Sequence, residues 1–457
     1  MSLLTNDASL QSAAGGERFS TAPAALRHRL EAFRSDRQPA TRTPSFAQWS
    51  RSLRLACDWL IKRSTITETA LPAEQNGHGY PYADWSGCTR EYDASRRKWS
   101  VFAPLWHTGQ AVKALVMAHS VLGDDDLLAA ANHSAQFILR AQIRRPGHVD
   151  DGLILAFENG DPVRSWTSCM LESLDGLISL GHATGNEAYF DAALLASRWA
   201  QRRVWVPNES LLIDEYDPAT STPRVSIWSR EFGVVGRPLI DDGVFLTMGE
   251  YGNDEELIDL FLALAERLLA DEYPSGNWLG FPPCHPNRGL IHPRHAYWWG
   301  RPMIMAWQKT GDDRFLACAR RCADWYVRAQ RRDGGMFRET DLDFRTSTFG
   351  HATSGVLSAA SLWSDLIQLG DEQYKAPCLS ALRFGFTMQM VETSDMNLHG
   401  SIVEKVVLLD GSDRPPFLVR DLGSIFYIQA LVKAMQAGLI GDGACEAATT
   451  EKAASTY

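Results

Sequence analysis

The pattern of apolar and polar positions predicts a chain built from paired helices. Residues 46–62 form the first strong helix, because Trp49, Leu53, Cys57 and Leu60 recur at helical spacing. Five helix pairs follow, each with an apolar helix, a short turn and an amphipathic helix that carries its charges on one face. A sixth apolar helix, residues 422–437, has no amphipathic partner after it. The apolar helices of the five pairs begin near Trp106, Trp166, Asp242, Tyr297 and Ala352.

A Gly-Asp or Gly-Asn turn joins the two helices of each pair. These turns recur at intervals of 59 to 67 residues, at Gly123, Gly185, Gly252, Gly311 and Gly370. A steady period of this length indicates one supersecondary unit repeated along the chain. We therefore predict one large domain over residues 45–437, preceded by a partly disordered arm (1–44) and followed by a disordered tail (438–457).

The helix count predicts an all-α fold, an (α/α)6 toroid or barrel. Apolar helices such as SGVLSAASLWSDLI must be buried on all sides, as six helices of an inner ring are. Pairing of the first helix with the last would close the ring. An open helical solenoid is the alternative, but its concave face would leave such helices partly exposed.

The long connections predict where the site lies. Turns within a pair are short, whereas the returns to the next apolar helix are long and include small hairpins. Long connections in a compact domain are usually functional. All of them would lie on one rim, around the N-terminal ends of the inner helices, at residues 64–101, 143–165, 204–237, 271–294, 331–349 and 389–418.

The composition limits the classes of molecule that the protein is expected to bind. The chain has 15 Trp, and large aromatic residues suit walls that grip partly polar ligands. A net charge of −10 without a basic stripe argues against nucleic acid and against an anionic membrane. The eight cysteines show no paired metal or disulfide spacing, and no signal peptide or membrane span is visible. We expect reduced thiols, a cytoplasmic location, no cofactor and a small saccharide as partner, and we leave a homodimer open.

Two adjacent carboxylates, Asp241 and Asp242, stand at the start of the third inner helix. Neighbouring residues on a helix point about 100° apart, so only one of them can aim into the cavity. We expect the other to cap the helix. A carboxyl group aimed into a hydrophobic barrel would have a raised pKa, suited to general acid catalysis.

The fourth inner helix opens with RHAYWWGR, which concentrates proton-transfer groups, cations and stacking surfaces. His295 and Tyr297 are the candidates for proton transfer. Arg294 and Arg301 are candidates to bind a carboxylate, and Trp298 and Trp299 to stack on sugar rings. Cys284, His285, His292 and His295 could supply zinc ligands, but their spacing matches no compact metal pattern, so we predict no metal.

Other rim residues complete the candidate site. On the first two return loops and the helices that follow them, the binding candidates are aromatic residues and one histidine, although loop aromatics can equally bury themselves: Tyr80, Trp85, Trp106, His107 and Trp166. At the last two inner helices the candidates are His351 for catalysis and Arg420 and Asp421 for binding. His351 and Asp421 could each be plain helix caps.

The repeats HTGQAVKALVMAHSVLGDDDLLAAANHSAQFILRAQ and YWWGRPMIMAWQKTGDDRFLACARRCADWYVRAQRRDGG resemble those of the six-hairpin glycosidase superfamily of (α/α)-barrel carbohydrate-active enzymes. They look like repeats of unsaturated uronyl hydrolases and of the helical domain of glucuronyl C5-epimerases. In the hydrolases an Asp near the start of an inner helix protonates the enol-ether double bond of the substrate, and IDDGVF (240–245) is the counterpart here. RHAYWW (294–299) is similar to the Tyr/His pair of some polysaccharide lyases with this barrel.

The resemblance implies three functional hypotheses. The leading one is a glycoside hydrolase that acts on a small, uronic-acid-containing oligosaccharide, with Asp242 or Asp241 as general acid/base. The second is a uronate lyase or C5-epimerase that abstracts a proton with Tyr297 or His295. The third is a saccharide-binding protein without catalysis, whose carboxylates only cap helices.

Overall fold

The protein is described here from a computed structural model, which covers residues 43–94, 96–158, 160–285, 287, 289–345, 353–406, 417–419 and 421–441. The chain forms two compact units. One unit comprises the described residues of Met1–Leu60, Tyr92–Lys98 and Tyr326–Tyr457, and the other comprises those of Ile61–Glu91 and Trp99–Trp325. We call them the terminal unit and the central unit.

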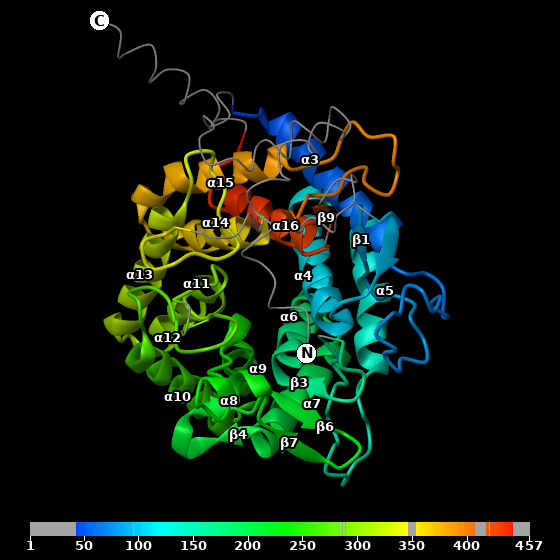
Figure 1. Ribbon diagram of the computed structural model, residues 1–457, viewed down its shortest axis with the longest axis vertical. Coiled ribbons are helices and arrows are strands. Elements are labelled where there is room, and N and C mark those ends of the chain that lie inside the picture. Colours follow the sequence, from blue (N-terminus) through cyan, green and yellow to red (C-terminus); the bar gives the residue numbers. More distant parts are fainter. Residues whose placement is uncertain are drawn as a thin grey trace, which may run out of the picture. The chain divides into compact units, whose positions relative to one another are not determined.

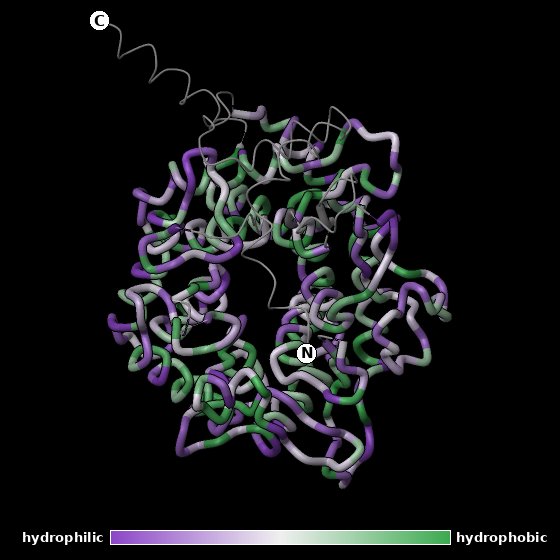
Figure 2. Tube along the Cα trace, viewed as in Figure 1, coloured by the Kyte–Doolittle hydropathy of each residue, from purple (hydrophilic) through white to green (hydrophobic). Residues whose placement is uncertain are grey.

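The central unit contains four of the predicted helix pairs (Figure 1). Along the chain, buried apolar helices alternate with amphipathic helices. The amphipathic helices carry both hydrophobic and hydrophilic residues (Figure 2). The pairs are α4 (Pro104–Leu122) with α5 (Asp125–Arg140), α6 (Thr167–Thr184) with α7 (Glu187–Arg203), α9 (Val244–Gly252) with α10 (Glu255–Asp271), and the interrupted α11 (His295–Trp298) and α12 (Pro302–Thr310) with α13 (Asp313–Ala329), which ends in the terminal unit.

The terminal unit contains the first and last predicted helices. Helix α3 (Phe46–Trp59) starts at Ser45, whose side chain forms a capping box with Gln48. It packs against α16 (Asp421–Gln436), where the hydroxyl groups of Ser52 and Tyr427 lie 2.8 Å apart. The predicted pairing of the first helix with the last is therefore present. Helices α14 (Thr353–Gln368) and α15 (Lys375–Thr387) form the remaining pair.

The predicted turns end the inner helices in left-handed backbone conformations. Gly123, Gly185 and Gly311 are the C-terminal caps of α4, α6 and α12, with φ between 63° and 72°. After α9 it is Asn253, with φ 48°, that takes this conformation in place of the predicted Gly252. Both residue types tolerate positive φ, which explains why the Gly-Asp and Gly-Asn patterns mark helix ends.

Short strands lie in the long returns. In the central unit β3 (Ser165–Trp166), β6 (Glu215–Asp217) and β7 (Thr222–Arg224) form an antiparallel sheet, and β4 (Trp205–Val206) pairs with β5 (Leu211–Leu212). Residues Tyr92 and Asp93 of β1 (Glu91–Asp93) pair with β9 (Phe417–Val419), which pairs with β8 (Lys405–Val406). Strand β2 covers Lys98–Ser100, and the short helices are η2 (Leu60–Ser64), η3 (Pro207–Glu209), α8 (Ile227–Glu231), η4 (Asp241–Gly243) and η6 (Glu372–Tyr374).

Two glycines let α4 and α6 approach each other closely. A Cβ atom on Gly109 would lie 2.4 Å from the Cα atom of Ser173, and one on Gly176 would lie 2.2 Å from the carbonyl oxygen of Gly109. Neither distance is tolerated between real atoms, so only glycine fits at these two positions. The contact brings polar side chains of the two helices together.

Candidate active site

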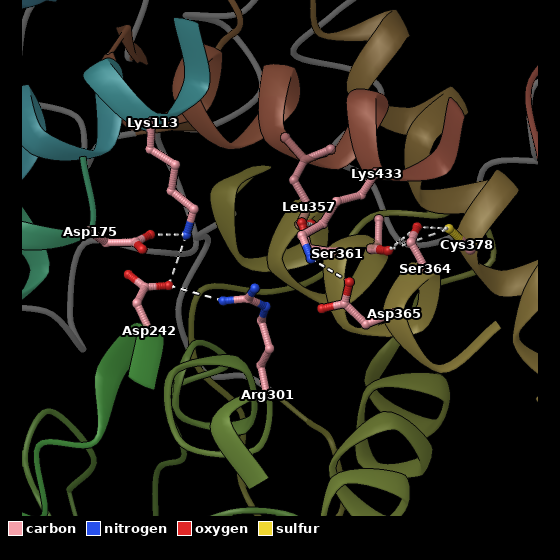
Figure 3. A network of polar contacts seen from close by, with 11 residues as sticks. Lys113, Asp175, Asp242, Arg301, Leu357, Ser361, Ser364, Asp365, Cys378 and Lys433 are labelled. Atoms are coloured by element: carbon pink, nitrogen blue, oxygen red, sulfur yellow. Dashed lines mark hydrogen bonds and ion pairs between the residues drawn. The ribbon is translucent and has the colours of Figure 1, made fainter. Parts of the chain in front are cut away.

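A buried ion cluster lies where α4, α6, η4 and the start of α12 meet in the central unit (Figure 3). Lys113 Nζ binds Asp175 and lies 2.9 Å from Oδ1 of Asp242. The same oxygen of Asp242 is 3.3 Å from Arg301 Nη1. Gln110 Nε2 donates to Oδ2 of Asp242 at 3.0 Å and to the carbonyl oxygen of Glu172 at 2.9 Å. Both oxygens of Asp242 are therefore held.

The local backbone explains how these side chains meet. Asp242 has φ 53°, a left-handed conformation that Asp adopts more readily than most residues. No side chain of η4 or α9 caps the helix, so the expectation that one of the two Asp residues would act as a cap is wrong. Arg301 lies at the break between α11 and α12, immediately before Pro302 at the first turn of α12.

The cations keep Asp242 ionised. Burial raises the pKa of this carboxyl group, but the charges of Lys113 and Arg301 and the hydrogen bonds outweigh burial and hold the pKa below its usual range. Burial lowers the pKa of Lys113, but the negative charges of Asp175 and Asp242 raise this pKa by more than burial lowers it. The ammonium group therefore also stays charged.

Asp241 has the opposite character. Its side chain is 5% exposed, and its Oδ2 has no hydrogen-bond partner among the described residues. Burial, and next the negative charge of Asp242, raise the pKa of Asp241 to about 7. The two adjacent carboxyl groups thus have pKa values displaced in opposite directions, an arrangement that separates an acid from an anion.

Glu172, on α6, is a third buried carboxyl group that we did not predict. Burial raises its pKa well above the usual value, and the charges of Asp241 and Asp242 raise it further. The sequence contains a pattern from which Glu172 could have been predicted. Polar side chains interrupt inner helices that are otherwise apolar, and those in α4 and α6 are the ones the cluster uses: Gln110, Lys113, Glu172 and Asp175.

An aromatic cage surrounds Arg294 beside these carboxyl groups. The Arg294 guanidinium lies 5.6 Å from the ring centroid of Trp106 and 5.4 Å from that of Trp298. His292 stacks on Trp298 at 6.0 Å, with an angle of 8° between the rings. The charge of Arg294 lowers the pKa of Glu172, which shows that the cage and the carboxyl groups are close. The indole N–H groups of Trp106 and Trp298 have no acceptor among the described residues.

His295 does not have the geometry of a proton-transfer group. It is fully buried, its Nδ1 is 3.3 Å from Cys284 Sγ, and its Nε2 is 3.2 Å from the carbonyl oxygen of Pro282. Burial, and next the charge of Arg237, lower the pKa of His295 to about 3, so the ring is neutral. It stacks on Trp299 at 4.2 Å, and the buried Trp299 is likewise part of the core. We therefore assign His295 to packing, whereas the Trp299 side chain also lies close enough to Asp241 to lower the pKa of that carboxyl group.

The first-loop aromatics are also core residues. The Tyr80 hydroxyl donates to the carbonyl oxygen of Phe102 at 2.8 Å, and Trp85 packs on Phe137. Both side chains are almost fully buried, which argues against a role as binding platforms and favours the alternative that loop aromatics bury themselves. His107 is buried against the edge of Trp106.

Trp166 and Tyr297 remain candidates. Trp166 is 5% exposed, packs 5.4 Å from Trp228 and has an indole N–H without an acceptor among the described residues. Tyr297 is buried and lies near enough to Lys113 to raise its pKa. Asp421 is the buried first residue of α16 in the terminal unit, where Oδ1 accepts from the backbone N–H of Leu422. His351 and Arg420 lie outside the described residues.

Within the described ranges, no three His, Cys, Asp or Glu side chains are grouped so that they could hold a metal ion, and this includes the set from Cys284 to His295. The seven cysteines in those ranges are buried and free, and Cys445 lies outside them. The helices that the structure describes include none with the length and apolarity needed to cross a membrane.

Comparison with solved structures identifies the fold class. An unsaturated glucuronyl hydrolase specific for heparin is 14% identical, with a TM-score of 0.61 over 87% of this chain and 99% of the other. Cellobiose 2-epimerase from Bacillus thermoamylovorans is 12% identical, with a TM-score of 0.60 over 84% and 99%. A glucuronyl hydrolase from Bacillus sp. GL1, responsible for the degradation of glycosaminoglycan, is 15% identical, with a TM-score of 0.55 over 87% and 98%.

These neighbours have the (α/α)6 barrel fold of six-hairpin glycosidases, and the mostly helical chain shares their fold class. Closure of the ring stays a prediction. No family model matches the chain, and no curated protein matches it either.

Proposed function

We propose that this protein is a carbohydrate-active enzyme that hydrolyses a glycosidic linkage in a small, uronic-acid-containing oligosaccharide. The observation that carries the proposal is the carboxyl group of Asp241, which is buried, has a pKa of about 7 and leaves one oxygen without a partner among the described residues. Glucuronyl hydrolases and sugar epimerases of the same fold class support action on a sugar. Fold likeness suggests the substrate class by analogy, so the chemistry is argued from the site.

Asp241 is the proposed proton donor. Burial, and next the negative charge of the ionised Asp242 beside it, raise its pKa to about 7, so a substantial share of this group holds a proton near neutral pH. In an unsaturated substrate the proton would go to one carbon of the enol-ether double bond, and water would add to the neighbouring carbon to give a hemiketal. Opening of this ring would leave a hemiacetal at the anomeric carbon, which would release the linked sugar as an alcohol and so break the glycosidic bond. In a saturated substrate it would go to the glycosidic oxygen as that bond breaks, with water attacking the anomeric carbon. The protonated Glu172 would donate a hydrogen bond to a sugar hydroxyl.

Arg294 and its cage are the proposed binding surface. The Trp106 and Trp298 rings hold the guanidinium in place, and their indole N–H groups would donate to sugar oxygens. A guanidinium offers five N–H donors in a planar fork that matches a carboxylate. This combination suits a sugar that carries both hydroxyl groups and an acid group.

A lyase or an epimerase is the second candidate. Tyr297 near Lys113 supports it, as do cellobiose 2-epimerase and a sugar epimerase among the structural neighbours. Elimination would create a double bond that absorbs ultraviolet light, whereas hydration of an unsaturated sugar would erase such absorbance. Epimerisation would change neither the absorbance nor the number of reducing ends.

The test is turnover of a panel of saturated and unsaturated uronic oligosaccharides, followed by ultraviolet absorbance, reducing ends and NMR of the product. We expect hydrolysis that falls by about 10³-fold in Asp241→Asn, in the range of general acid catalysis. Asp259→Asn, at an exposed position of α10, is the matched control and should keep full turnover. Undiminished hydrolysis by Asp241→Asn would refute the assignment, and binding of the panel without any conversion would favour a saccharide-binding protein.

A further inference from the structure

A cavity of about 580 Å³ in the central unit is lined by residues of β7 and α8 and by residues adjoining β3, β7 and α8. Its walls combine three arginines with small apolar residues, and none of the lining residues is acidic: Arg164, Arg224, Val225, Arg230, Gly233, Val234 and Val235. A protein with a net charge of −10 thus gathers three guanidinium groups around one cavity. Guanidinium groups bind carboxylates and sulfates through charge-assisted hydrogen bonds.

Two of these arginines are oriented by carboxylates outside the lining. Arg164 binds Asp161 at 2.6 Å through Nε and Glu215 at 2.8 Å through Nη1, and Arg224 binds Asp217 at 3.1 Å through Nη2. Because a guanidinium has five N–H donors, each keeps donors beyond these contacts. Their side chains remain 42% and 51% exposed, so a ligand can reach them.

Arg230 differs from the other two. Its side chain is exposed and makes no ion pair or hydrogen bond with the described residues, although it points to the same cavity. Arg230 therefore lies beside two arginines that carboxylates hold in place, and its own guanidinium is available to bind an anionic ligand.

Helix α8, which carries Arg230, is held in place by the buried Asp214. Oδ2 of Asp214 accepts from Ser226 Oγ at 2.7 Å and from Ser229 Oγ, and Oδ1 accepts from Arg237 Nε at 2.7 Å. The backbone N–H of Val234 donates to the carbonyl oxygen of Ser229 at 3.0 Å. The cavity walls are therefore preorganised, which lowers the entropy lost on binding.

Side-chain contacts link the surroundings of the cavity to the candidate active site. Arg164 immediately precedes strand β3. This strand is followed directly by α6, the helix that carries Glu172. Arg237, which binds Asp214 beneath the cavity, also binds Ser168 Oγ at 2.9 Å in the first turn of α6 and lowers the pKa of Asp241. Trp166 packs on Trp228 of α8 between the two places. The cavity and the carboxyl cluster thus flank the same end of α6.

We propose that this cavity is a second subsite, which binds an anionic group on a sugar unit distant from the bond that is cleaved. The inference rests on the proposed function, and it adds that the substrate extends beyond one residue and carries a further carboxylate or sulfate. The arginines bind the anion, and Val225, Val234 and Val235 contact the apolar face of the sugar ring.

The test uses the full chain with sodium glucuronate and sodium sulfate as separate probes, titrated by calorimetry at constant ionic strength against sodium chloride. Arg230→Gln is the test variant because no described contact depends on this side chain, and Arg332→Gln, at an exposed position of the terminal unit, is the control. We expect Arg230→Gln to weaken binding of one probe at least tenfold and Arg332→Gln to leave it unchanged. The probe with the larger effect identifies carboxylate or sulfate as the anion.

Kinetics separate this inference from the proposed function. In Arg230→Gln the KM for an acidic oligosaccharide of two or more units should rise about tenfold while kcat stays within twofold. Equal binding of both probes by wild type and Arg230→Gln would overturn the subsite even if Asp241-dependent hydrolysis is found. Binding that depends on Arg230 and persists in Asp241→Asn, without hydrolysis of any substrate, would keep an anion site and reject the proposed function.

Discussion

Two buried lysines, one in each unit, form ion pairs between neighbouring inner helices. Lys113 of α4 binds Asp175 of α6, and Lys433 of α16 binds Asp365 of α14 (Figure 3). Beside Lys433, the hydroxyl group of Ser361 donates to the carbonyl oxygen of its own helix residue Leu357. We refer to the two places as the Lys113 cluster and the Lys433 pair.

The Lys113 cluster contains a carboxylate in addition to the ion pair between its two helices. The Lys113 cluster receives a second carboxylate, Asp242, from η4, the short helix that precedes α9, and this charge acts on the pKa of Asp241. In the Lys433 pair, the lysine and its carboxylate come from two helices, α16 and α14. The second carboxylate therefore couples the ion pair between α4 and α6 to the neighbouring Asp241.

The largest expected contrast is between Asp242→Asn and Asp365→Asn. Without the charge of Asp242, the pKa of Asp241 falls toward that of an ordinary Asp, so less of it is protonated near neutral pH. Turnover at pH 7 should fall by about 10²- to 10³-fold, within the range of general acid catalysis, and should recover partly at lower pH. Asp365→Asn leaves Asp242 and its charge in place, so it should change turnover less than about twofold. An unshifted pH profile of kcat/KM in Asp242→Asn would show that the two carboxyl groups are not coupled.

The next contrast is between Lys113→Met and Lys433→Met. Each variant leaves a mostly buried carboxylate without its lysine partner, which should cost up to about 3–5 kcal/mol of unfolding free energy. Denaturant unfolding should find similar losses in both. Only Lys113→Met should also lose turnover at temperatures where both variants are folded. Equal loss of turnover would mean that the lysines act only through stability.

A smaller effect is expected on the pH dependence of stability. The pKa of Asp241 is raised in the folded state to about 7, so the folded protein retains a proton that the unfolded chain releases above about pH 4. This contribution is complete below the unfolded pKa and is lost as pH rises to about 7, at no more than about 1.4 kcal/mol per pH unit. Unfolding free energies at pH 4.5, 6 and 7.5 should therefore decline less in Asp241→Asn than in Asp259→Asn. Parallel declines would contradict the raised pKa.

The smallest effect is expected for Ser361→Ala beside the Lys433 pair. The hydroxyl group bonds to the carbonyl oxygen of Leu357, which the helix already uses, so its loss should cost no more than about 1 kcal/mol. Gln110→Leu in the Lys113 cluster removes a hydrogen bond to an ionised carboxylate and should cost about 1.5–3 kcal/mol. Thermal unfolding compares the two, and a reversed order would contradict the distinction between cluster and pair.

The helices were predictable because their signals are local. The Gly-Asp turns and the apolar pattern identify every inner helix, and they also predict the contact between α3 and α16. What the pattern does not reveal is the interruption between α11 and α12, because apolar residues continue through it.

The site was only partly predictable because its contacts are distant in sequence. Asp241 and Asp242 were found as a pair, but their opposite roles depend on Lys113 and Arg301, which lie far away in the chain. Lys113 and Glu172 were overlooked since their helices are almost wholly apolar. Conversely, Tyr80 and Trp85 carry the residue types of a sugar platform, and only the packing shows that they are buried.

The left-handed backbone of Asp242 has a consequence for how this protein can evolve. At φ 53°, β-branched and bulky side chains are strongly disfavoured, whereas Asn and Gly adopt this conformation. Asn and Gly codons are each a single nucleotide change from Asp codons. Descendants can thus lose the charge at this position without a backbone penalty, which gives the fold a short mutational route from catalysis to binding.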